Sequence, residues 1–229
     1  FDLNGTSQPG SRFGEVLTAG DFDRDGFDDL AVGVPRYDAN AELQDVGLVA
    51  VVYGSVGGLA PARLDWLWED LLLGSGSSEP RQMTPISSGA FTGVLFVSNL
   101  GSGSSIGVVH RSDGTAIGTV PLGVRKSSDP GTEMVVIGSA GAQVALMSAA
   151  DDTDAVDREL WRSNASLAGT TRVKDIASHQ GSSLPSTPVI ADKRAWFAAY
   201  TPATGFELYV SQGSTASTSL VNDLRPGPA

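Results

Sequence analysis

Four of the five aspartates in residues 21–29 are the side chains of this sequence best placed to do chemistry. Residues 21–29 read Asp-Phe-Asp-Arg-Asp-Gly-Phe-Asp-Asp, which puts carboxylates at loop positions 1, 3, 5 and 9. Alternate residues of a tightly curled loop project to one side, so Asp21, Asp23 and Asp25 should converge, with Asp29 closing the group. Four such charges need a cation, and a hard, all-oxygen donor set selects Ca²⁺ over Zn²⁺ or Cu²⁺. The segment therefore predicts a calcium site.

Two further features of this loop support calcium. Gly26 allows the chain to reverse direction, and the main-chain carbonyl of Phe27 at position 7 adds another oxygen ligand. An EF-hand would require Glu at position 12, which is Val32 here, and two flanking helices, whereas 29–34 has the pattern of a strand. Asp28 is expected to point outwards. The alternative is a solvated acidic hairpin without a cation.

Catalytic chemistry has weaker support in this sequence, and no catalytic residue is predicted. Cysteine is absent, which excludes thiol catalysis, disulfides and zinc–thiolate sites. The two histidines are His110, on an expected strand, and His179, in a polar segment without a second group that specifies a base. The acidic segment Asp151–Asp157 has irregular spacing and lacks a glycine; it is either a solvated loop or a second cation site.

Composition narrows the class of protein and its partners. The chain has 229 residues, of which 41% are hydrophobic and 18% charged, enough for one large domain or two small ones. The net charge of −11 argues against nucleic acid and disfavours an anionic membrane surface. No apolar run is long enough to span a bilayer, and the start at Phe1 suggests a processed or excised product.

The elements that must position these residues are short strands. Gly and Pro together make up 40 of 229 residues, which favours many turns. The expected strands are Asp29–Val34, Gly47–Tyr53, Gly93–Val97, Met134–Ile137, Val144–Met147, Ala195–Tyr200 and Glu207–Val210. Residues 63–73 fit either a short amphipathic helix or a strand. Regular short strands with turns between them indicate a sandwich, a barrel or a propeller.

Internal repeats favour the propeller. Residues 159–163 read Glu-Leu-Trp-Arg-Ser, and Glu-Leu-Tyr-Val-Ser follows 48 residues later at 207–211. An earlier copy starts at Val109, and its Gly118-Thr119 matches Gly169-Thr170, 51 residues on. A period near 50 residues with about four strands is the size of a propeller blade. Chance similarity of Ser- and Gly-rich β segments is the alternative.

Two resemblances follow from these motifs. Residues of about 90–228 resemble the bacterial repeats written Glu-Leu-Trp-x-Ser-Asp-Gly-Thr, which occur in tandem in secreted and surface proteins. The first part of the chain, about 4–70, resembles an FG-GAP repeat, the blade unit of the integrin α-subunit propeller. Phe13-Gly14 precedes the acidic loop, and Gly33-Val34-Pro35 follows it, with Val34 where the family name implies Ala.

The FG-GAP resemblance implies a structural calcium ion. In that family the ion lies in a hairpin loop, and the match assigns its ligands to Asp21, Asp23, Asp25, Phe27 and Asp29. Neither resemblance transfers a catalytic residue to this chain.

The expected protein is an all-β propeller, or part of one, built from four-stranded blades of about 50–60 residues. Residues 1–70 would form the calcium-bearing blade and 71–229 about three further blades of the same body. The expected function is non-enzymatic: secreted or cell-surface, bacterial, and used for adhesion, binding or assembly with a protein or glycan ligand. The number of blades and the closure of the ring stay open, as does an oligomer or larger assembly. The alternatives are a propeller glycosidase or lyase with an acidic site, or a purely architectural subunit.

The binding surface is expected on the connections Arg36–Val46 and Gly74–Gly89. Both are rich in polar and small residues, and propellers generally bind through loops at one end of the ring.

Overall fold

A computed structural model describes residues 9–38, 47–60, 64–67, 78–99, 106–115, 117–127, 132–151, 156–178 and 181–226. Throughout these ranges the regular secondary structure consists of sixteen antiparallel β-strands, without a helix. The fold is therefore all-β, as predicted. The described part of the chain also contains no helix with the length and apolar character needed to cross a bilayer.

The strands form four consecutive antiparallel meanders, called blades 1 to 4 below. Blade 1 contains β1 (Val16–Gly20), β2 (Asp29–Val34), β3 (Leu48–Val52) and β4 (Leu64–Leu67). Blade 2 contains β5 (Arg81–Ser88), β6 (Phe91–Asn99), β7 (Ile106–Ser112) and β8 (Val120–Ser127). Blade 3 contains β9 (Val135–Ile137), β10 (Val144–Asp151), β11 (Glu159–Ser163) and β12 (Thr171–Lys174). Blade 4 contains β13 (Val189–Ala191), β14 (Arg194–Thr201), β15 (Gly205–Ser211) and β16 (Ser219–Asn222).

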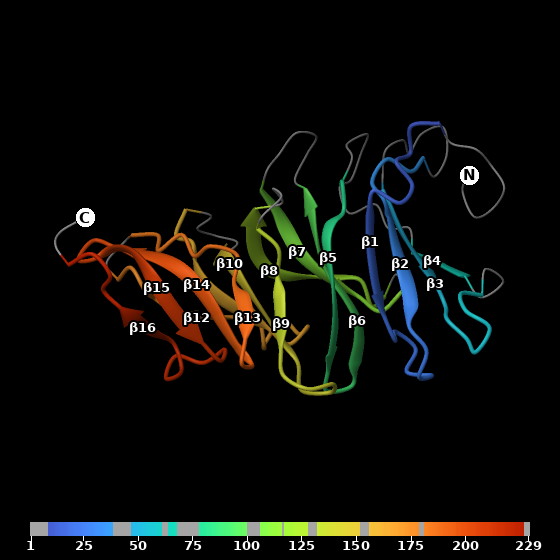
Figure 1. The fold of residues 1–229 in the computed structure, drawn as a ribbon. Coiled ribbons are helices and arrows are strands. Elements are labelled where there is room, and N and C mark those ends of the chain that lie inside the picture. The colour runs from blue at the N-terminus through green and yellow to red at the C-terminus, as the bar shows by residue number, and fades with distance from the viewer. Residues whose placement is uncertain are drawn as a thin grey trace.

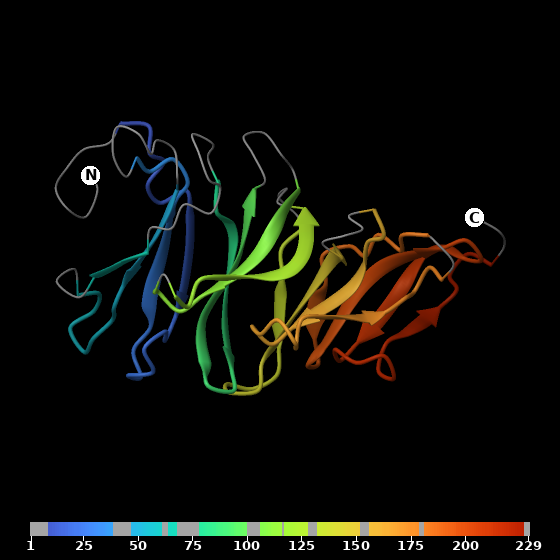
Figure 2. The ribbon, with the colours of Figure 1, turned by 180° about the vertical axis from the view of Figure 1, so that it is seen from behind.

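The blades stand side by side in chain order. The first strand of each blade contacts the first strand of the next, so that β1, β5, β9 and β13 form a row across one side of the molecule (Figure 1). The view from behind shows the same order, with blades 1 and 4 at opposite ends (Figure 2). Blades 2 and 3 are also joined into one eight-stranded sheet, because the end of β10 pairs with β8 through Ala150 and Asp151.

Apolar side chains fill the spaces between neighbouring blades. Between blades 1 and 2 they include Val49, Val51 and Phe96, and Phe96 is fully buried. The cluster between blades 2 and 3 contains Leu95, Val97, Val109, Leu122, Val124, Met134, Met147 and Trp161. The cluster between blades 3 and 4 contains Ile137, Leu146, Leu160, Val173, Ala195, Phe197, Ala199 and Tyr209. Alternating residues of each sheet therefore face opposite neighbours, which accounts for strands that are apolar on both faces.

The third and fourth strands of blades 2, 3 and 4 are joined by the same hairpin. A serine at the end of one strand and a threonine before the next are hydrogen-bonded through their hydroxyls at 2.7–2.8 Å, in the pairs Ser112–Thr119, Ser163–Thr170 and Ser211–Thr218. Each threonine hydroxyl also donates to a main-chain carbonyl four residues earlier. The repeated Ser and Gly-Thr positions of the sequence thus have a shared structural role.

The prediction that residues 74–89 are a connection carrying the binding surface is wrong for residues 81–88. These residues form strand β5, which pairs with β6 and was not among the predicted strands. It contains Pro85, which lacks an N–H, and its pairing with β6 shifts register between Arg81 and Thr84, where Gln82 has a φ of 54°. Proline and a bulge conceal a strand from pattern analysis. In 63–73, where helix and strand were both open, residues 64–67 form strand β4, and 61–63 and 68–77 lie outside the described residues.

Lys126 occupies an unusual place near the junction of blades 2 and 3. Its side chain is 1% exposed, and Nζ donates to Gln82 Oε1 at 2.8 Å and to the carbonyl oxygens of Ser127 and Thr132. A buried ammonium is tolerated only with such donors satisfied. The lysine therefore ties β8 to β5 and to the segment that leads into blade 3.

Candidate metal centre

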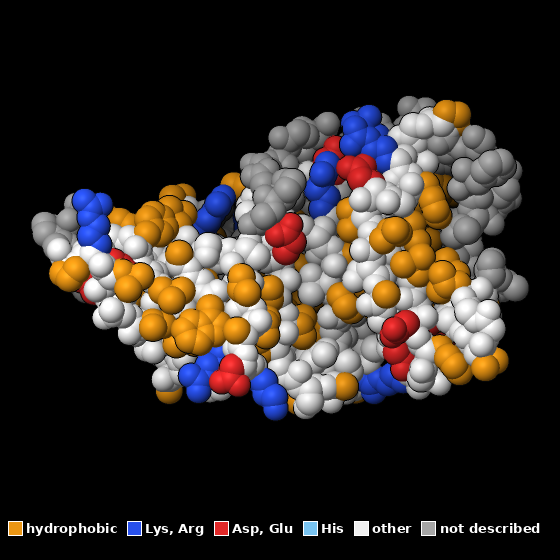
Figure 3. Space-filling view, viewed as in Figure 1, with side chains coloured by type: hydrophobic (Ala, Val, Ile, Leu, Met, Phe, Trp, Pro, Cys, Tyr) orange, Lys and Arg blue, Asp and Glu red, His pale blue; other side chains and the backbone are white. Residues whose placement is uncertain are grey.

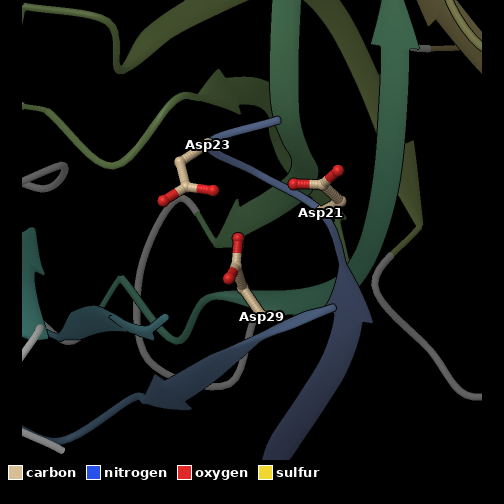
Figure 4. A group of neighbouring side chains, drawn as sticks. All are labelled: Asp21, Asp23 and Asp29. Carbon is tan, nitrogen blue, oxygen red and sulfur yellow. The ribbon is translucent and has the colours of Figure 1, made fainter. Parts of the chain in front are cut away.

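The connection between β1 and β2 holds the acidic loop. Carboxylate oxygens of Asp21, Asp23 and Asp29 lie within 4.8 Å of one another. Figure 4 shows the three side chains directed toward a common space, two from the loop and one from the start of β2. The structure thus brings together three of the four aspartates predicted as ligands.

Hydrogen bonds from main-chain N–H groups to Asp21, the first aspartate, hold the loop in a tight turn. Asp21 accepts hydrogen bonds from the N–H groups of Asp25 and Gly26, both at 3.0 Å, and Asp23 accepts one from Asp25 at 3.2 Å. Arg24 and Gly26 have φ values of 62° and 92°, in the left-handed region, which allows the chain to reverse. This is the local geometry that the alternating Asp-x-Asp-x-Asp-Gly pattern predicts.

Asp29 is the best-anchored carboxylate of the group. It is 1% exposed, and its two oxygens accept hydrogen bonds from Phe22 N at 2.6 Å and Gly54 N at 2.7 Å. A Cβ on residue 54 would collide with the main-chain carbonyl of Asp28, so only glycine brings its N–H this close. Gly54 follows β3, and the third strand therefore helps to fix a ligand at the start of the second.

The other two predicted ligands lie differently. The Asp25 carboxylate accepts a hydrogen bond from Phe27 N at 3.0 Å and is not part of the group of three. The Phe27 ring is 41% exposed. Ligation by Asp25 and by the Phe27 carbonyl stays a prediction. Asp28 is exposed.

The three grouped residues fit a hard divalent cation. All their donor atoms are carboxylate oxygens, the donors that Ca²⁺ prefers, and oxygens 2.3–2.6 Å from one central ion lie within about 5 Å of each other. Three negative charges at this distance repel one another, and one of them is almost fully removed from water. A cation between them would relieve both costs.

Arg24 connects this loop to blade 2. Its Nε donates to Thr92 Oγ1 at 2.5 Å, and Nη2 donates to the carbonyl of Gly89 at 3.2 Å. In the sequence Arg24 occupies a variable position of the Asp-x-Asp-x-Asp pattern, so its role was missed. Its role depends on the β5–β6 turn lying next to the loop in space, and the spacing of residues along the sequence does not reveal this.

A cavity of about 510 Å³ lies beside the loop. Its walls include Asp21, Phe22 and Arg24 from the loop, Thr92 from β6 and Gln143 from the turn before β10. The polar groups around it bond mainly to one another; Gln143 Oε1, for example, accepts from Ser87 N at 2.7 Å. The cavity is thus a gap between three blades.

His110 has a structural environment. Its ring stacks on Phe96 with centroids 5.4 Å apart, and Nδ1 lies 3.1 Å from the carbonyl oxygen of Val108. Burial lowers the pKa of His110, and the hydrogen bond to Val108 opposes this shift. His110 occupies the hairpin position filled by Trp161 in blade 3 and Tyr209 in blade 4, both of which are buried. His179, residues 39–46 and 74–77 of the predicted binding connections, and 152–155 of the second acidic segment lie outside the described residues.

Comparison with known proteins identifies one part of the chain. A curated relative, the phosphatidylinositol-glycan-specific phospholipase D of Mus musculus, is 41% identical over 68 residues. This stretch is 30% of the present chain and 8% of the relative, so the chain spans a small fraction of that protein. No solved structure matches. Residues 13–52, which contain β1, the acidic loop, β2 and β3, match the FG-GAP family and are an FG-GAP repeat, the unit that forms β-propeller blades.

Proposed function

We propose that this chain is a non-enzymatic, extracellular β-propeller body that binds a protein or glycan partner and carries a structural Ca²⁺ in the 21–29 loop. The observation that carries the proposal is the convergence of Asp21, Asp23 and Asp29 within an FG-GAP repeat. The ion would complete the fold of the first blade. Asp25 and the Phe27 carbonyl would supply further ligands as the metal orders the loop.

The position of the loop explains why the ion would be structural. Both oxygens of Asp29 already hold main-chain N–H groups of two segments, and Arg24 reaches from the loop to blade 2. An ion that rigidifies residues 21–29 therefore stabilises the hairpin and its contact with the next blade. When bound, Ca²⁺ supplies charge neutralisation.

The remaining blades support the same kind of protein. The repeated Ser–Thr hairpins of blades 2 to 4 fit tandem Glu-Leu-Trp-x-Ser-Asp-Gly-Thr repeats, which we propose for residues 90–228. Such repeats occur in secreted and surface proteins, and this supports an extracellular, bacterial origin. A net charge of −11 favours a cationic, neutral-glycan or calcium-bridged partner over an anionic polymer.

Binding is favoured over catalysis by the surroundings of the shifted groups. Burial lowers the pKa of His110 and raises the pKa values of Glu159 and Tyr209. Each of these side chains is packed between strands or held by main-chain groups. The name of the mouse relative provides one reaction to assay, phospholipase D cleavage of a phosphatidylinositol-glycan. We expect no such cleavage by this chain, because the stretch of likeness covers only 8% of that relative.

The calcium site can be tested by titration. Protein stripped with a chelator should bind one Ca²⁺ per chain by calorimetry, and Asp23→Ala should abolish that heat. At free Ca²⁺ one hundred times the dissociation constant, binding should stabilise the fold by about 2.7 kcal/mol. Asp28→Asn is the matched control, since Asp28 is an exposed aspartate of the same loop outside the group of three. Equal melting curves with and without chelator, in protein shown to be metal-loaded, would refute the site.

The partner can be sought with the calcium-loaded chain. A glycan array and a pull-down against extracellular proteins should yield a ligand, and turnover assays on glycan, ester and peptide substrates should yield no product. Turnover that is lost on mutating an acidic residue outside 21–29 would instead establish the enzyme alternative.

A further inference from the structure

The side of blade 4 that faces away from blade 3 is apolar, and no other described strand packs on it. Strands β14 and β15 alternate, so that Ala195, Phe197 and Tyr209 face blade 3 while the intervening residues face outwards. Here this second side is called the outer face of blade 4; it comprises Val189, Trp196, Ala198, Leu208, Val210 and Val221, which are partly or fully exposed. Figure 3 shows hydrophobic side chains gathered over this end of the molecule.

The corresponding side of blade 3 is the one that blade 4 covers. Leu160, Val173 and Ile176 lie 48 residues before Leu208, Val221 and Leu224, at the same places in the repeat. Leu160 is 0% and Val173 3% exposed, and both belong to the cluster between blades 3 and 4. Their counterparts are apolar too, yet Val221 is 44% and Leu224 70% exposed. Blade 4 thus presents the same kind of packing surface, and none of the other described segments of the chain covers it.

A buried glutamate marks the same difference. Glu159 accepts hydrogen bonds from the N–H groups of Ile176 and Ala177 in its own blade. It also accepts bonds from Ser183 N at 3.1 Å and Ser183 Oγ at 2.6 Å, and Ser183 lies on the segment that enters blade 4. The next blade therefore supplies two of the four donors to this carboxylate.

Glu207 is the counterpart of Glu159, and within the described part of the chain its donors come from its own blade alone. It is 5% exposed and accepts hydrogen bonds from Leu224 N at 3.0 Å and Arg225 N at 3.3 Å. The two positions that Ser183 fills at Glu159 are thus the ones that a following blade would fill at Glu207.

Two cationic residues of blade 3 that bond to blade 4 have uncharged counterparts in blade 4. Arg162 donates to Gly213 O at 2.9 Å and Lys174 to Thr218 O at 2.8 Å across the boundary of blades 3 and 4. The matching residues are Val210 and Asn222. Docking on the outer face would therefore depend on apolar burial and on Glu207.

We propose that the outer face of blade 4 is a docking surface for one further four-stranded blade of the same repeat, whose entering segment donates a serine N–H and hydroxyl to Glu207. The occupant follows from continuity with the interface of blades 3 and 4. The inference does not depend on the calcium site, because the residues that carry it belong to blades 3 and 4.

The experiment extends the full chain by one repeat. A second copy of residues 179–226 is placed directly after residue 226, in place of residues 227–229, so that the duplicate of Ser183 follows Glu207 by the 24 residues that separate Glu159 from Ser183. The extended chain should melt several degrees higher than the parent, bind less of the dye ANS, and resist protease in the duplicate. Glu207→Gln should lower the melting temperature of the extended chain by about 4 °C, and that of the parent by less.

The control is the extended chain in which the duplicate of Ser183 is replaced by alanine. It should keep the lower dye binding but lose part of the gain in melting temperature. A duplicate that is degraded while dye binding and melting temperature stay at parental values would overturn the proposal. So would a parent that forms a dimer in sedimentation with its outer face protected from the dye, because a second copy would then be the occupant.

Discussion

At the scale of single residues, buried carboxylates held by main-chain N–H groups recur in this molecule. Asp29 joins β2 to Gly54, Glu159 joins blade 3 to the segment entering blade 4, and Glu207 holds the chain after β16. Each acidic side chain thereby fixes segments distant in sequence.

Replacing Glu159 should be costly. Four hydrogen-bond donors face the Glu159 carboxyl group, and Glu159→Gln replaces one of its two acceptor oxygens with an NH₂ donor. We therefore expect a loss of about 2 kcal/mol in the free energy of unfolding at pH 5. Glu207→Gln, with two donors, should cost about half as much. Urea denaturation of both variants measures the difference. Equal losses would contradict a role for Ser183 as a donor.

The loss at Glu159 should also depend on pH. Burial raises the pKa of the Glu159 carboxyl above 4.5, although hydrogen bonds from Ser183 and the main chain oppose this. The folded pKa therefore exceeds the unfolded one, and the stability contributed by this group is full below pH 4.5 and lost as pH rises through the folded pKa. The gap between wild type and Glu159→Gln should narrow from pH 5 to pH 7.5.

His110 should show the opposite dependence. Burial lowers the pKa of its imidazole below 6.5, so the folded state favours the neutral ring. Its contribution to stability is present above pH 6.5 and is lost as pH falls through the folded pKa. NMR titration should give a ring pKa below 6.5, and His110→Gln should reduce the loss of stability between pH 7.5 and pH 5.5. A ring that titrates at or above 6.5 would be inconsistent with the packing on Phe96.

At the scale of elements, the repeated Ser–Thr hairpin fastens the third and fourth strands. Ser163→Ala removes the partner of the Thr170 hydroxyl in a buried turn, and should cost about 1 kcal/mol. Ser211→Ala should cost a similar amount, because the turn of blade 4 has the same bond. Denaturant midpoints give both values. The exposed Ser214→Ala, in the same loop, serves as a comparison for Ser211.

The sequence predicted a strand or loop correctly where its structure depends on residues that are close together in the chain. The range Asp29–Val34 coincides with β2, and the aspartate spacing predicted the loop that brings Asp21 and Asp23 together, because alternation and a glycine are readable in order. Strand β5 escaped because Pro85 and a bulge break its pattern. The role of Arg24 could not be predicted from the sequence, because its hydrogen-bond partners lie 65 and 68 residues further along the chain. The role of Glu159 could not be predicted either, because its partners lie 17 to 24 residues away.

At the scale of the whole molecule, neighbouring blades are coupled by side-chain hydrogen bonds as well as by apolar packing. Arg24 couples blade 1 to blade 2, Arg111 donates to Ala165 O across blades 2 and 3, and Arg162 donates to Gly213 O across blades 3 and 4. Repeat arrays of this kind gain stability from nearest-neighbour interfaces.

Arg24→Ala should therefore weaken the link between the metal loop and the rest of the chain. We expect Ca²⁺ binding to persist, because no ligand is removed, while the ion protects the main-chain amides of blade 2 less well. Hydrogen exchange of residues 89–93 with and without Ca²⁺ measures the coupling, and Arg12→Ala, an exposed arginine of blade 1, is the control. Unchanged protection of 89–93 in Arg24→Ala would show that apolar packing alone transmits the effect.

The order of the blades also bears on how the chain acquires its structure. Strands pair within a blade or, at β8 and β10, with the next one, so the described pairings join segments that are near in sequence. The entropy of closing a loop is then small at each step, which favours rapid folding for a β protein. Each blade can form as it leaves the ribosome, and the one before it provides the surface on which it condenses. Synthesis and folding of these four blades would then proceed in the same direction.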